Sequence, residues 1–516
     1  MDFTKCQVCG TEVPKSMMFC SSCGNPIDHE AAIAVVPEKT RAGISLKKLL
    51  IPVISLIVVV AAIIVGLTMF KPSKYEYRKG SLYISSNEDS VIIIPHNKAK
   101  VEIDGYLRTG YRSLDGIKAA QLIAEDGDDW DTLLYITDKI QTISDGVHSV
   151  WLASSGNAFA YASEYNNSDN TAELWLYSDG KSKMLSDEFS VSSYNCTISP
   201  DGKSIAYVTF DGEEYTCVVT DGKTVVKLGK DIIPVGVADG AKYIYYKKSG
   251  TLYVQTGISG DVKEKLGDDA NNIYANKDLS QVFYTSNSKS YVSINGGKKQ
   301  ALTGSRSYLV VPSGTAFFSD SNITICGITS FANTFYCNSD NALIYINGKY
   351  ETSRIAKNVD DAYLATDGKT LTYLSRNSIY KVNGTKSGDV AVEIVTDDVE
   401  SFIAVDNGSA VYYINEDDEI YYQKGTGSPS LVTSDFSYGG YGMGYALYAG
   451  NTFYYISDDE VFVSSGSRGT RIGGIDGEPY YISASKYAIA ISSDDDGDTL
   501  SYRSVDGKKF DLMHQN

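Results

Sequence analysis

The sequence is poor in histidine, and it lacks a long helical hydrophobic pattern in its larger part. Only four histidines occur in 516 residues, and they are His29, His96, His148 and His514. Because histidine is the usual general base and a common metal ligand, this scarcity limits acid–base and metal chemistry. None of the four lies in a recognisable Ser/His/Asp motif. The sequence therefore identifies no reaction, and we expect a binding protein more than an enzyme.

Cationic side chains are also fewer than acidic ones. The chain has 64 acidic and 46 basic residues, a net charge of −18. Residues 1–74 hold five acids and eight Lys or Arg, which leaves 59 acids and 38 bases, a net of −21, in residues 75–516. Such a surface repels phosphate backbones, so we expect no nucleic-acid binding by this part. The simplest role of the charge is to keep the protein soluble.

Cysteines at metal-binding spacing are present near the N-terminus. Two CxxC pairs, each followed by glycine, are formed by Cys6, Cys9, Cys20 and Cys23. Four thiolates complete a closed tetrahedral site, which is the structural kind of zinc site with no open position for catalysis. A redox CxxC or two local disulfides are the alternatives. The doubled spacing favours structural Zn²⁺ bound by all four cysteines.

The second pair lies in the stretch FCSSCGNPI, Phe19–Ile27. This stretch resembles the second knuckle of bacterial zinc-ribbon domains, which implies a small zinc ribbon over residues 1–28. Zinc ribbons in general bind nucleic acid or protein. Since only Lys5 and Lys15 are basic here, we expect protein contact or simple folding of the N-terminus.

A linker, residues 29–48, precedes a run of 22 uncharged residues at 49–70, LLIPVISLIVVVAAIIVGLTMF. At about 1.5 Å per residue, a helix of this length crosses the ~30 Å hydrocarbon core of a bilayer. The alternative is a cleaved signal peptide. It is disfavoured by the length of the run and by the metal motif that precedes it. We therefore expect a retained single-pass membrane anchor.

The charges beside this run do not orient it, because four Lys or Arg flank each end (39–48 and 71–79). The N-terminal cysteines do orient it, since free thiolates need a reducing compartment. We expect a cytoplasmic N-terminus and an extracytoplasmic domain over residues 75–516.

The large part repeats one pattern, in which a polar turn with glycine is followed by an alternating strand rich in tyrosine. Tyrosine is abundant, with 40 Tyr against 16 Phe and 3 Trp. It suits half-buried strand positions. About ten copies occur, with turn glycines at Gly116, Gly156, Gly202, Gly240, Gly314, Gly368, Gly408 and Gly450 and a copy without glycine around Leu279. The wide interval after Gly314 suggests an extra hairpin, FANTFYCNSDNALIYING, at residues 331–348.

A period near 40 residues with four short strands predicts an all-β fold, a β-propeller of roughly 8–10 four-stranded blades or two tandem rings. An array of β-sandwiches is the rival fold. One copy, SPDGKSIAYVTF at Ser199–Phe210, resembles the blade hairpin of TolB-type and WD-like propellers. That resemblance supports the propeller prediction.

Other candidate sites have simpler explanations. The acidic stretches SSDDDGDT (492–499) and EDGDDWDT (125–132) depart from calcium-loop spacing and are expected as solvated turns. The Gly-rich stretch 435–448 lacks a phosphate-loop lysine. Cys326 and Cys337 could form a disulfide. Cys196 and Cys217 are expected on non-neighbouring strands of one blade, too far apart to be linked.

These observations predict a membrane-anchored binding or sensing protein whose propeller presents a face to a protein or glycan ligand. One alternative is an extracytoplasmic enzyme, for example one acting on glycans with paired carboxylates in the propeller channel. The other is a purely structural envelope scaffold. An enzyme predicts two acids in a concave, tyrosine-lined pocket, and a scaffold predicts no pocket.

Overall fold

A computed structural model provides the structure of the chain. It describes residues 3–5, 12–14, 82–85, 89–94, 99–125, 131–434, 447–474, 488–492, 499–504 and 509–514, except for residues 261, 298, 314, 320–321, 384–390, 397, 450–451, 458–459 and 467. The chain divides into two compact units, Met1–Pro72 and Ser73–Asn516. The first unit contains one described hairpin, in which β1 (Phe3–Lys5) pairs antiparallel with β2 (Glu12–Pro14).

Two predictions fall on residues that the structure does not describe. The four N-terminal cysteines and the apolar run at 49–70 both lie outside the described residues. Within the part of the chain that is described, no helix has the length and hydrophobicity needed to span a bilayer.

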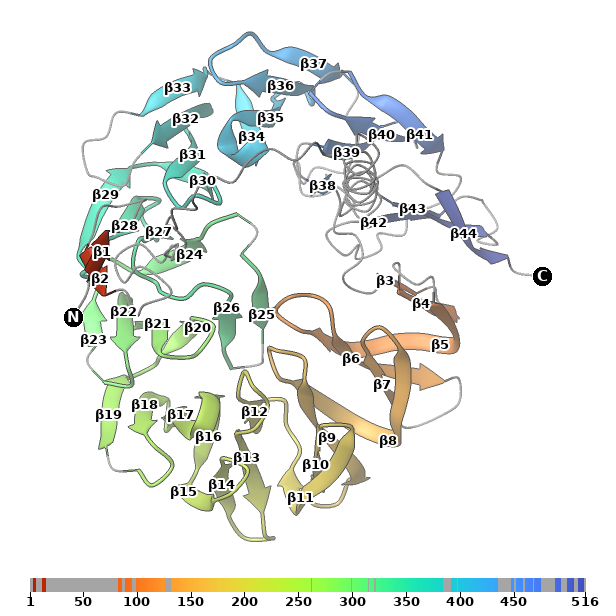
Figure 1. Cartoon of the computed structure of the whole chain (residues 1–516), viewed down its shortest axis with the longest axis vertical. Coiled ribbons are helices and arrows are strands. Elements are labelled where there is room, and N and C mark those ends of the chain that lie inside the picture. Colours follow the sequence, from red (N-terminus) through yellow and green to blue (C-terminus); the bar gives the residue numbers. More distant parts are fainter. Residues whose placement is uncertain are drawn as a thin grey trace, which may run out of the picture. The chain divides into compact units, whose positions relative to one another are not determined.

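The second unit consists of strands joined by short turns, and its described residues contain no α-helix. Its recurring element is a four-stranded antiparallel sheet whose strands follow one another in chain order (Figure 1). Four sheets have this form without interruption: β16 (Ile232–Val237), β17 (Tyr243–Lys248), β18 (Thr251–Thr256) and β19 (Val262–Gly267); β30 (Val359–Leu364), β31 (Thr370–Ser375), β32 (Ser378–Asn383) and β33 (Val392–Val395); β34 (Val399–Val405), β35 (Ala410–Asn415), β36 (Ile420–Lys424) and β37 (Ser430–Thr433); and β38 (Leu447–Ala449), β39 (Thr452–Ser457), β40 (Glu460–Ser464) and β41 (Thr470–Gly474). Short 3-10 turns, η1 (Asp239–Ala241) and η2 (Asp406–Gly408), lie between the first two strands of two of these sheets.

The N-terminal part of this unit is hydrogen bonded into one continuous 13-stranded sheet. The continuity arises because long strands leave one four-stranded group and enter the next, and because β11 (Lys181–Ser190) meets β13 (Ile205–Phe210) through a single residue pair. The groups on either side of that pair are called the β8–β11 and β12–β15 sheets below. In β8 (Ile140–Leu152), residues up to Val147 pair with β7 and those from Val147 onward pair with β9. The other strands of this region are β3 (Leu82–Ser85), β4 (Asp89–Ile94), β5 (Ala99–Arg112), β6 (Ala119–Glu125), β7 (Asp131–Ile136), β9 (Ala158–Asn166), β10 (Thr171–Ser178), β11 (Lys181–Ser190), β12 (Cys196–Ile198), β13 (Ile205–Phe210), β14 (Tyr215–Thr220) and β15 (Val225–Lys230).

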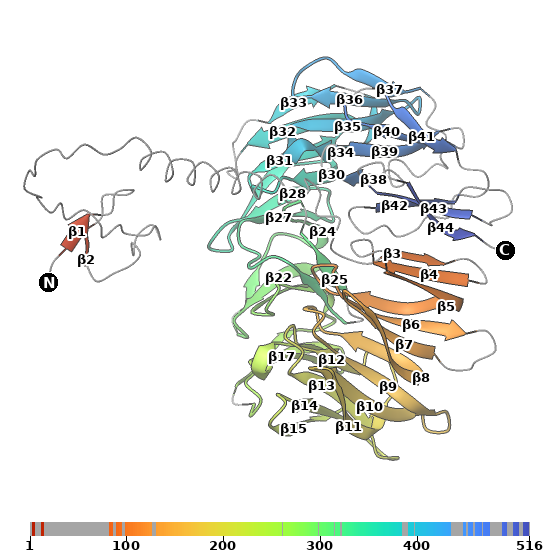
Figure 2. The same ribbon diagram turned by 45° about the vertical axis from the view of Figure 1, so that its right-hand side comes forward.

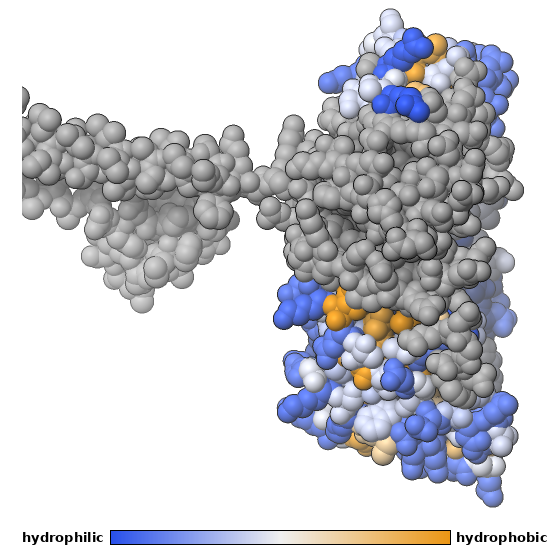
Figure 3. All heavy atoms as spheres, turned by 90° about the vertical axis from the view of Figure 1, so that its right-hand side faces the viewer, coloured by the Kyte–Doolittle hydropathy of each residue, from blue (hydrophilic) through white to orange (hydrophobic). Residues whose placement is uncertain are grey.

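Neighbouring sheets pack face to face through apolar side chains. Ala206 and Cys217 of the β12–β15 sheet form one buried cluster with Val237 and Ile244 of the β16–β19 sheet. Leu374 of the β30–β33 sheet packs in the same way with Phe402 of the next sheet. A single sheet of this size cannot bury its own apolar face, so stacking on neighbours supplies the core. On the face seen in Figure 3 the described surface is mostly hydrophilic with small separate hydrophobic patches.

The abundance of tyrosine follows from this stacking. In four sheets, a tyrosine of the second strand lies directly opposite a tyrosine of the third. Their rings stack with centroids 5.4–5.5 Å apart and planes 15–20° from parallel. The pairs are Tyr246–Tyr253, Tyr284–Tyr291, Tyr373–Tyr380 and Tyr413–Tyr421. The first tyrosine of each pair is buried and the second is half-buried, as expected for this residue on strands.

The turn between the first and second strands of each sheet, here called the first turn, needs a left-handed residue. Glycine supplies it in several copies, with φ of +78° at Gly202. The copy without glycine uses Leu279, with φ of +56°, as the sequence repeat indicated. In the β16–β19 sheet the equivalent position is Ala241, because its N–H donates to the carbonyl of Ala238 as that of Gly202 does to Ser199. The position expected from the sequence repeat, Gly240, is therefore one residue too early.

The prediction of an extra hairpin at residues 331–348 is wrong. Those residues include β27 (Thr334–Asn338) and β28 (Leu343–Ile346), the ordinary second and third strands of the sheet formed with β24 (Arg306–Val310) and β29 (Thr352–Ala356). The extra hairpin is β25 (Phe317–Ser319) and β26 (Thr324–Cys326). This hairpin does not pair with the strands that flank it in the sequence. Instead, β26 pairs in parallel with β20 (Asn271–Ala275) of the preceding sheet.

The receiving sheet consists of β20 (Asn271–Ala275), β21 (Gln281–Ser286), β22 (Lys289–Ile294) and β23 (Lys299–Ala301), and Figures 1 and 2 show the hairpin beside it. Phe318, Ile323 and Ile325 of the hairpin join a buried cluster with residues of three sheets. The Asn322 side-chain amide donates to the carbonyls of Tyr194 and Pro234, both at 2.9 Å. The inserted hairpin thus connects sheets that are distant in sequence.

The four cysteines of this unit, all on described strands, are buried and form no disulfide. Cys196 on β12 and Cys217 on β14 flank β13, as expected for non-neighbouring strands of one sheet. Cys326 and Cys337 lie on strands of different sheets, β26 and β27, and form no disulfide.

A three-stranded sheet of β42 (Ala488–Ser492), β43 (Thr499–Ser504) and β44 (Lys509–His514) ends the described chain. The all-β fold and the four-stranded repeat are therefore confirmed, and the packing of successive sheets is propeller-like. The number of blades, and one ring as opposed to two, stay predictions.

Candidate functional site

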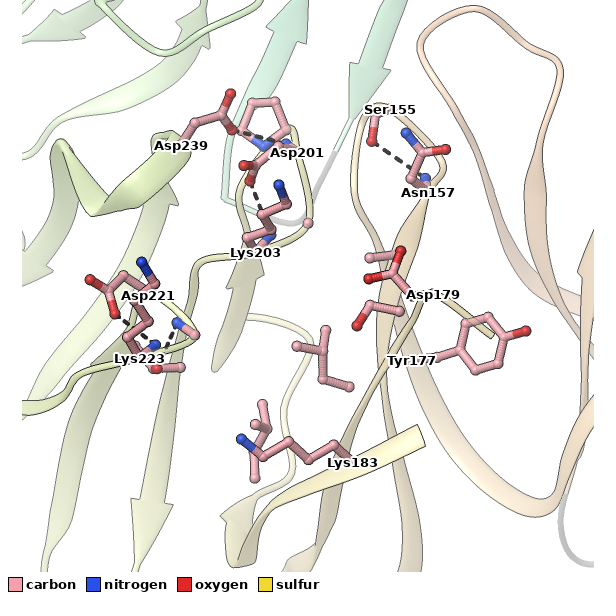
Figure 4. A pocket seen from close by; sticks show the side chains of 18 of the residues that line it. Ser155, Asn157, Tyr177, Asp179, Lys183, Asp201, Lys203, Asp221, Lys223 and Asp239 are labelled. Carbon is pink, nitrogen blue, oxygen red and sulfur yellow. Dashed lines mark hydrogen bonds between the residues drawn. The ribbon is translucent and has the colours of Figure 1, made fainter. Parts of the chain in front are cut away.

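A groove of about 1080 Å³ lies at the turns of the β8–β11 and β12–β15 sheets (Figure 4). Strands alternate in direction, so the first turn of a sheet and the turn between its third and fourth strands, here called the third turn, lie at the same end. The groove is lined by first-turn residues Ser155, Asn157, Pro200, Asp201, Gly202, Lys203 and Asp239, and by third-turn residues Ser178, Asp179, Gly180, Thr220, Asp221, Gly222 and Lys223.

Three of these turns contain the same tripeptide, Asp-Gly-Lys, beginning at Asp179, Asp201 and Asp221. Their glycines have φ of +77° to +85°, a conformation that L side chains rarely adopt. At Gly202 the space is also too small for a side chain, since a Cβ atom would lie 2.3 Å from Cβ of Ala158. Glycine thus allows the two sheets to approach closely beside the groove.

The aspartates of two turns are occupied by backbone amides. Oδ1 of Asp201 accepts from the amide of Lys203 at 3.0 Å, and Oδ1 of Asp221 accepts from the amides of Lys223 and Thr224 at 2.9 and 2.7 Å. These bonds lower the pKa of Asp221 below its ordinary value. The carboxylates therefore stabilise the turns that carry the lysines.

The lysines have no such partners. Among the described residues, the ammonium groups of Lys183, Lys203 and Lys223 form no hydrogen bond and no ion pair. All three side chains are exposed and line the groove (Figure 4). The charges of Lys203 and Lys223 help to lower the pKa of Asp201 and Asp221 in their own turns, but the three ammonium groups keep their hydrogen-bonding capacity for a ligand.

Two acids do meet at the groove. The amide of Asp201 donates to Oδ1 of Asp239 at 2.9 Å, which joins the first turns of consecutive sheets. Partial burial raises the pKa of Asp239, and the nearby charge of Asp201 adds to the rise. Partial burial acts in the same direction on Asp201, but the hydrogen bonds from Ser199 and Lys203 outweigh it and hold the pKa of Asp201 below its ordinary value. The pair thus behaves as one carboxylate held ionised and one more easily protonated.

The walls of the groove are partly apolar. Tyr177 and Tyr207 line it while being 7% and 4% exposed, and the Tyr135 hydroxyl donates to the carbonyl of Gly156 at 2.6 Å. Met184 on β11 and Val225 on β15 are 46% and 66% exposed, so they add accessible apolar surface to the groove. The site therefore combines charged turns with apolar contact surface, as binding sites for polar organic ligands do.

A second cavity, of about 570 Å³, lies where first turns meet the inserted hairpin. Leu114, Ser154, Pro200, Ala316 and Gly327 are among its lining residues. Asp115 and Lys277 are the only charged residues in that lining, so it contains no pair of carboxylates.

The structure places the sequence-based candidates as follows. Cys6, Cys9, Cys20 and Cys23, the acidic residues Asp494–Asp498 and the Gly-rich residues 435–446 lie outside the described residues. In the described part of the chain, no three His, Cys, Asp or Glu side chains are placed to hold a metal ion. The groove was not predicted from the sequence, although the recurrence of Asp-Gly-Lys about every 20 residues between 179 and 223 is a signal for it.

Comparison with known proteins identifies the N-terminus. A sequence model of the zinc-ribbon domain matches residues 5–27, so the chain begins with a zinc-ribbon domain. A search of curated proteins finds no match.

Three solved structures share part of the fold. They are the tricorn protease (11% identity, TM-score 0.28, covering 85% of this chain and 58% of that one), a eukaryotic initiation factor (10%, 0.37, 68% and 95%) and a putative TolB from Agrobacterium tumefaciens (14%, 0.27, 42% and 91%). At these identities and TM-scores the likeness carries no information about function.

Proposed function

We propose that the chain is a single-pass membrane protein whose residues 75–516 bind a ligand outside the cytoplasm, in the groove between the β8–β11 and β12–β15 sheets. The groove is the observation that carries the proposal, because it gathers charged turns from successive sheets around exposed apolar side chains. A purely structural scaffold needs no such cavity.

The zinc ribbon would fold around Zn²⁺ held by Cys6, Cys9, Cys20 and Cys23. The described hairpin fits this role, since β1 and β2 pair on either side of residues 6–11, which include the first CxxC pair. Structural zinc supplies folding energy to so small a domain and takes no part in catalysis. Thiolate ligands place this end in the reducing cytoplasm.

The anchor would be residues 49–70, since 22 uncharged residues suffice to span a bilayer. Protease added to intact cells is expected to remove residues beyond Lys71 and to leave the N-terminal segment. Complete protection of residues 75–516 would reverse the proposed orientation.

An enzyme is the less favoured reading. Asp201 and Asp239 do lie in a tyrosine-lined groove, but their oxygens bind backbone amides: Asp201 accepts from Lys203 in its own turn, and Asp239 accepts from Asp201 in the turn of the neighbouring sheet. The pair is better suited to connecting two sheets than to cleaving a substrate.

The binding role is tested by filling the groove in the full-length protein. Met184→Trp with Val225→Trp is expected to weaken binding to the envelope fraction of the producing cells by on the order of tenfold. Val262→Trp with Val392→Trp is the matched control, since these exposed valines lie on the fourth strands of other sheets. Equal binding by both variants and the wild type would refute the groove as the binding site.

A further inference from the structure

We propose that the ligand of this groove is an acidic glycan, a chain of sugars that carries carboxylate or phosphate groups. This inference rests on the proposed binding function and specifies its ligand class. The evidence is which charged side chains around the groove already form hydrogen bonds within the protein and which do not.

The positive groups of the groove are available to a ligand. Lys183, Lys203 and Lys223 approach the cavity from β11, a first turn and a third turn, and their ammonium groups have no hydrogen-bonded or ion-paired partner among the described residues. Charge-assisted hydrogen bonds to anionic oxygens are stronger than neutral ones. Anionic groups spaced along a chain could therefore contact successive lysines.

The negative groups are available only in part. Asp201 and Asp221 hold backbone amides of their own turns, so their charge is already partly neutralised. Asp179 has no partner among the described residues, and it can accept hydrogen bonds from ligand hydroxyls. A ligand with both anions and hydroxyls matches this set, and an acidic sugar has both.

The same set disfavours other polyanions. A nucleic acid places a phosphate at every residue and would bring some of them close to Asp179 and Asp239, which lie among the lysines. The exposed side chains of Met184 and Val225 offer apolar surface of the kind on which the C–H faces of sugar rings pack. The lysines, the aspartate and the apolar side chains that line the groove together suit a carbohydrate chain.

The test uses the full-length protein and the envelope-binding assay described above, with soluble oligosaccharides as competitors. A hexamer of mannuronic acid supplies carboxylates, cellohexaose phosphorylated at its 6-hydroxyls supplies phosphates, and unmodified cellohexaose is the neutral control. At least one acidic hexamer is expected to compete, and cellohexaose is not. Whichever acidic hexamer competes better identifies the anionic group.

Lys183→Gln, Lys203→Gln and Lys223→Gln together are expected to weaken the acidic hexamer on the order of 30-fold, about threefold for each lysine. The matched control changes Lys349, Lys357 and Lys369 to Gln, all exposed and outside the groove. Lys369 is especially apt, because it lies in an Asp-Gly-Lys first turn of another sheet. This control keeps the net charge equal to that of the triple groove variant.

The outcomes separate the two proposals. If envelope binding depends on Met184 and Val225 but cellohexaose competes equally, or the lysine variant binds normally, the acidic-glycan class is overturned and the binding role stands. If a lysine-rich peptide competes in place of the acidic hexamers, the ligand is cationic and the inference is wrong. If filling the groove changes nothing, the proposed function itself fails.

Discussion

Asp201 and Asp239 lie 38 residues apart in the chain and in consecutive sheets, and the backbone amide of Asp201 donates to Oδ1 of Asp239 at 2.9 Å. This contact between two turns therefore includes a titratable side chain, the carboxylate of Asp239. The related contact of the preceding sheet pair is purely main-chain, from the amide of Ser155 to the carbonyl of Pro200. This one turn-to-turn bond therefore responds to pH.

Asp239→Asn is expected to stabilise the protein at pH 7. Asn keeps the acceptor oxygen but removes the repulsion with Asp201. Since the pKa of Asp239 is raised in the folded state, the wild type loses stability as pH rises from near 3.8 through that raised pKa. The gain, a few tenths of a kcal/mol at this half-exposed site, should be present at pH 7 and vanish below about pH 4.

Thermal unfolding midpoints measured from pH 3 to 8 check this. Asp187→Asn, at an exposed aspartate with no hydrogen bond or ion pair among the described residues, is the control and should shift little. A destabilised Asp239→Asn at pH 7 would contradict the stated sign.

Asn322→Ala is expected to loosen the inserted hairpin. The substitution removes two hydrogen bonds, to the carbonyls of Tyr194 and Pro234, worth together about 1–2 kcal/mol. Amides of β25 and β26 should then exchange with deuterium roughly 5- to 30-fold faster. Asn167→Ala, on an exposed turn, serves as control, and unchanged exchange in both variants would argue against the role of Asn322.

The stacked tyrosines should be energetically coupled. A double-mutant cycle with Tyr373→Leu and Tyr380→Leu is expected to give a coupling of about 0.5–1.5 kcal/mol in urea unfolding. A cycle combining Tyr373→Leu with Tyr253→Leu, in another sheet, should give none. Equal values from both cycles would mean that stacking contributes nothing beyond burial.

The thiols of the second unit should be unreactive until the protein unfolds. Burial raises the pKa of Cys217 and Cys326 to about 12 and that of Cys337 to about 11, so at pH 8 they stay protonated. An alkylating reagent followed by peptide mass spectrometry should label none of them in the native state and all of them in urea. A Cys326–Cys337 disulfide would instead leave both unlabelled in urea without reductant.

Zinc should copurify with the full-length chain at about one ion per molecule. Cys6→Ser with Cys9→Ser is expected to abolish it without changing the unfolding of the second unit, because the two units are compact separately. Ser21→Ala with Ser22→Ala, in the spacer of the second pair, should retain the metal. Zinc retained in the cysteine variant would refute the ribbon's ligand set.

The repeat could be predicted because turn chemistry and tyrosine alternation are local. Leu279 was recognised in the glycine position since its neighbours keep the pattern. The position of the inserted hairpin could not be predicted from the sequence. Residues Phe317–Cys326 have the composition of an ordinary second strand, and only the pairing of β26 with β20 shows that they belong to an insertion. The groove could not be predicted for a similar reason. It forms where the third turns of two sheets lie beside their first turns, and that arrangement depends on how the sheets pack.

The β25–β26 hairpin changes how the array can come apart. Stacked repeats that contact only their neighbours can unfold one unit at a time from an end. Their total stability is approximately the sum of the repeat and nearest-neighbour interface terms. Here one segment belongs by sequence to one sheet and by pairing to another, with apolar side chains buried against several more. The middle of the array should therefore melt as a single cooperative block, and partial digestion should leave it as a resistant fragment.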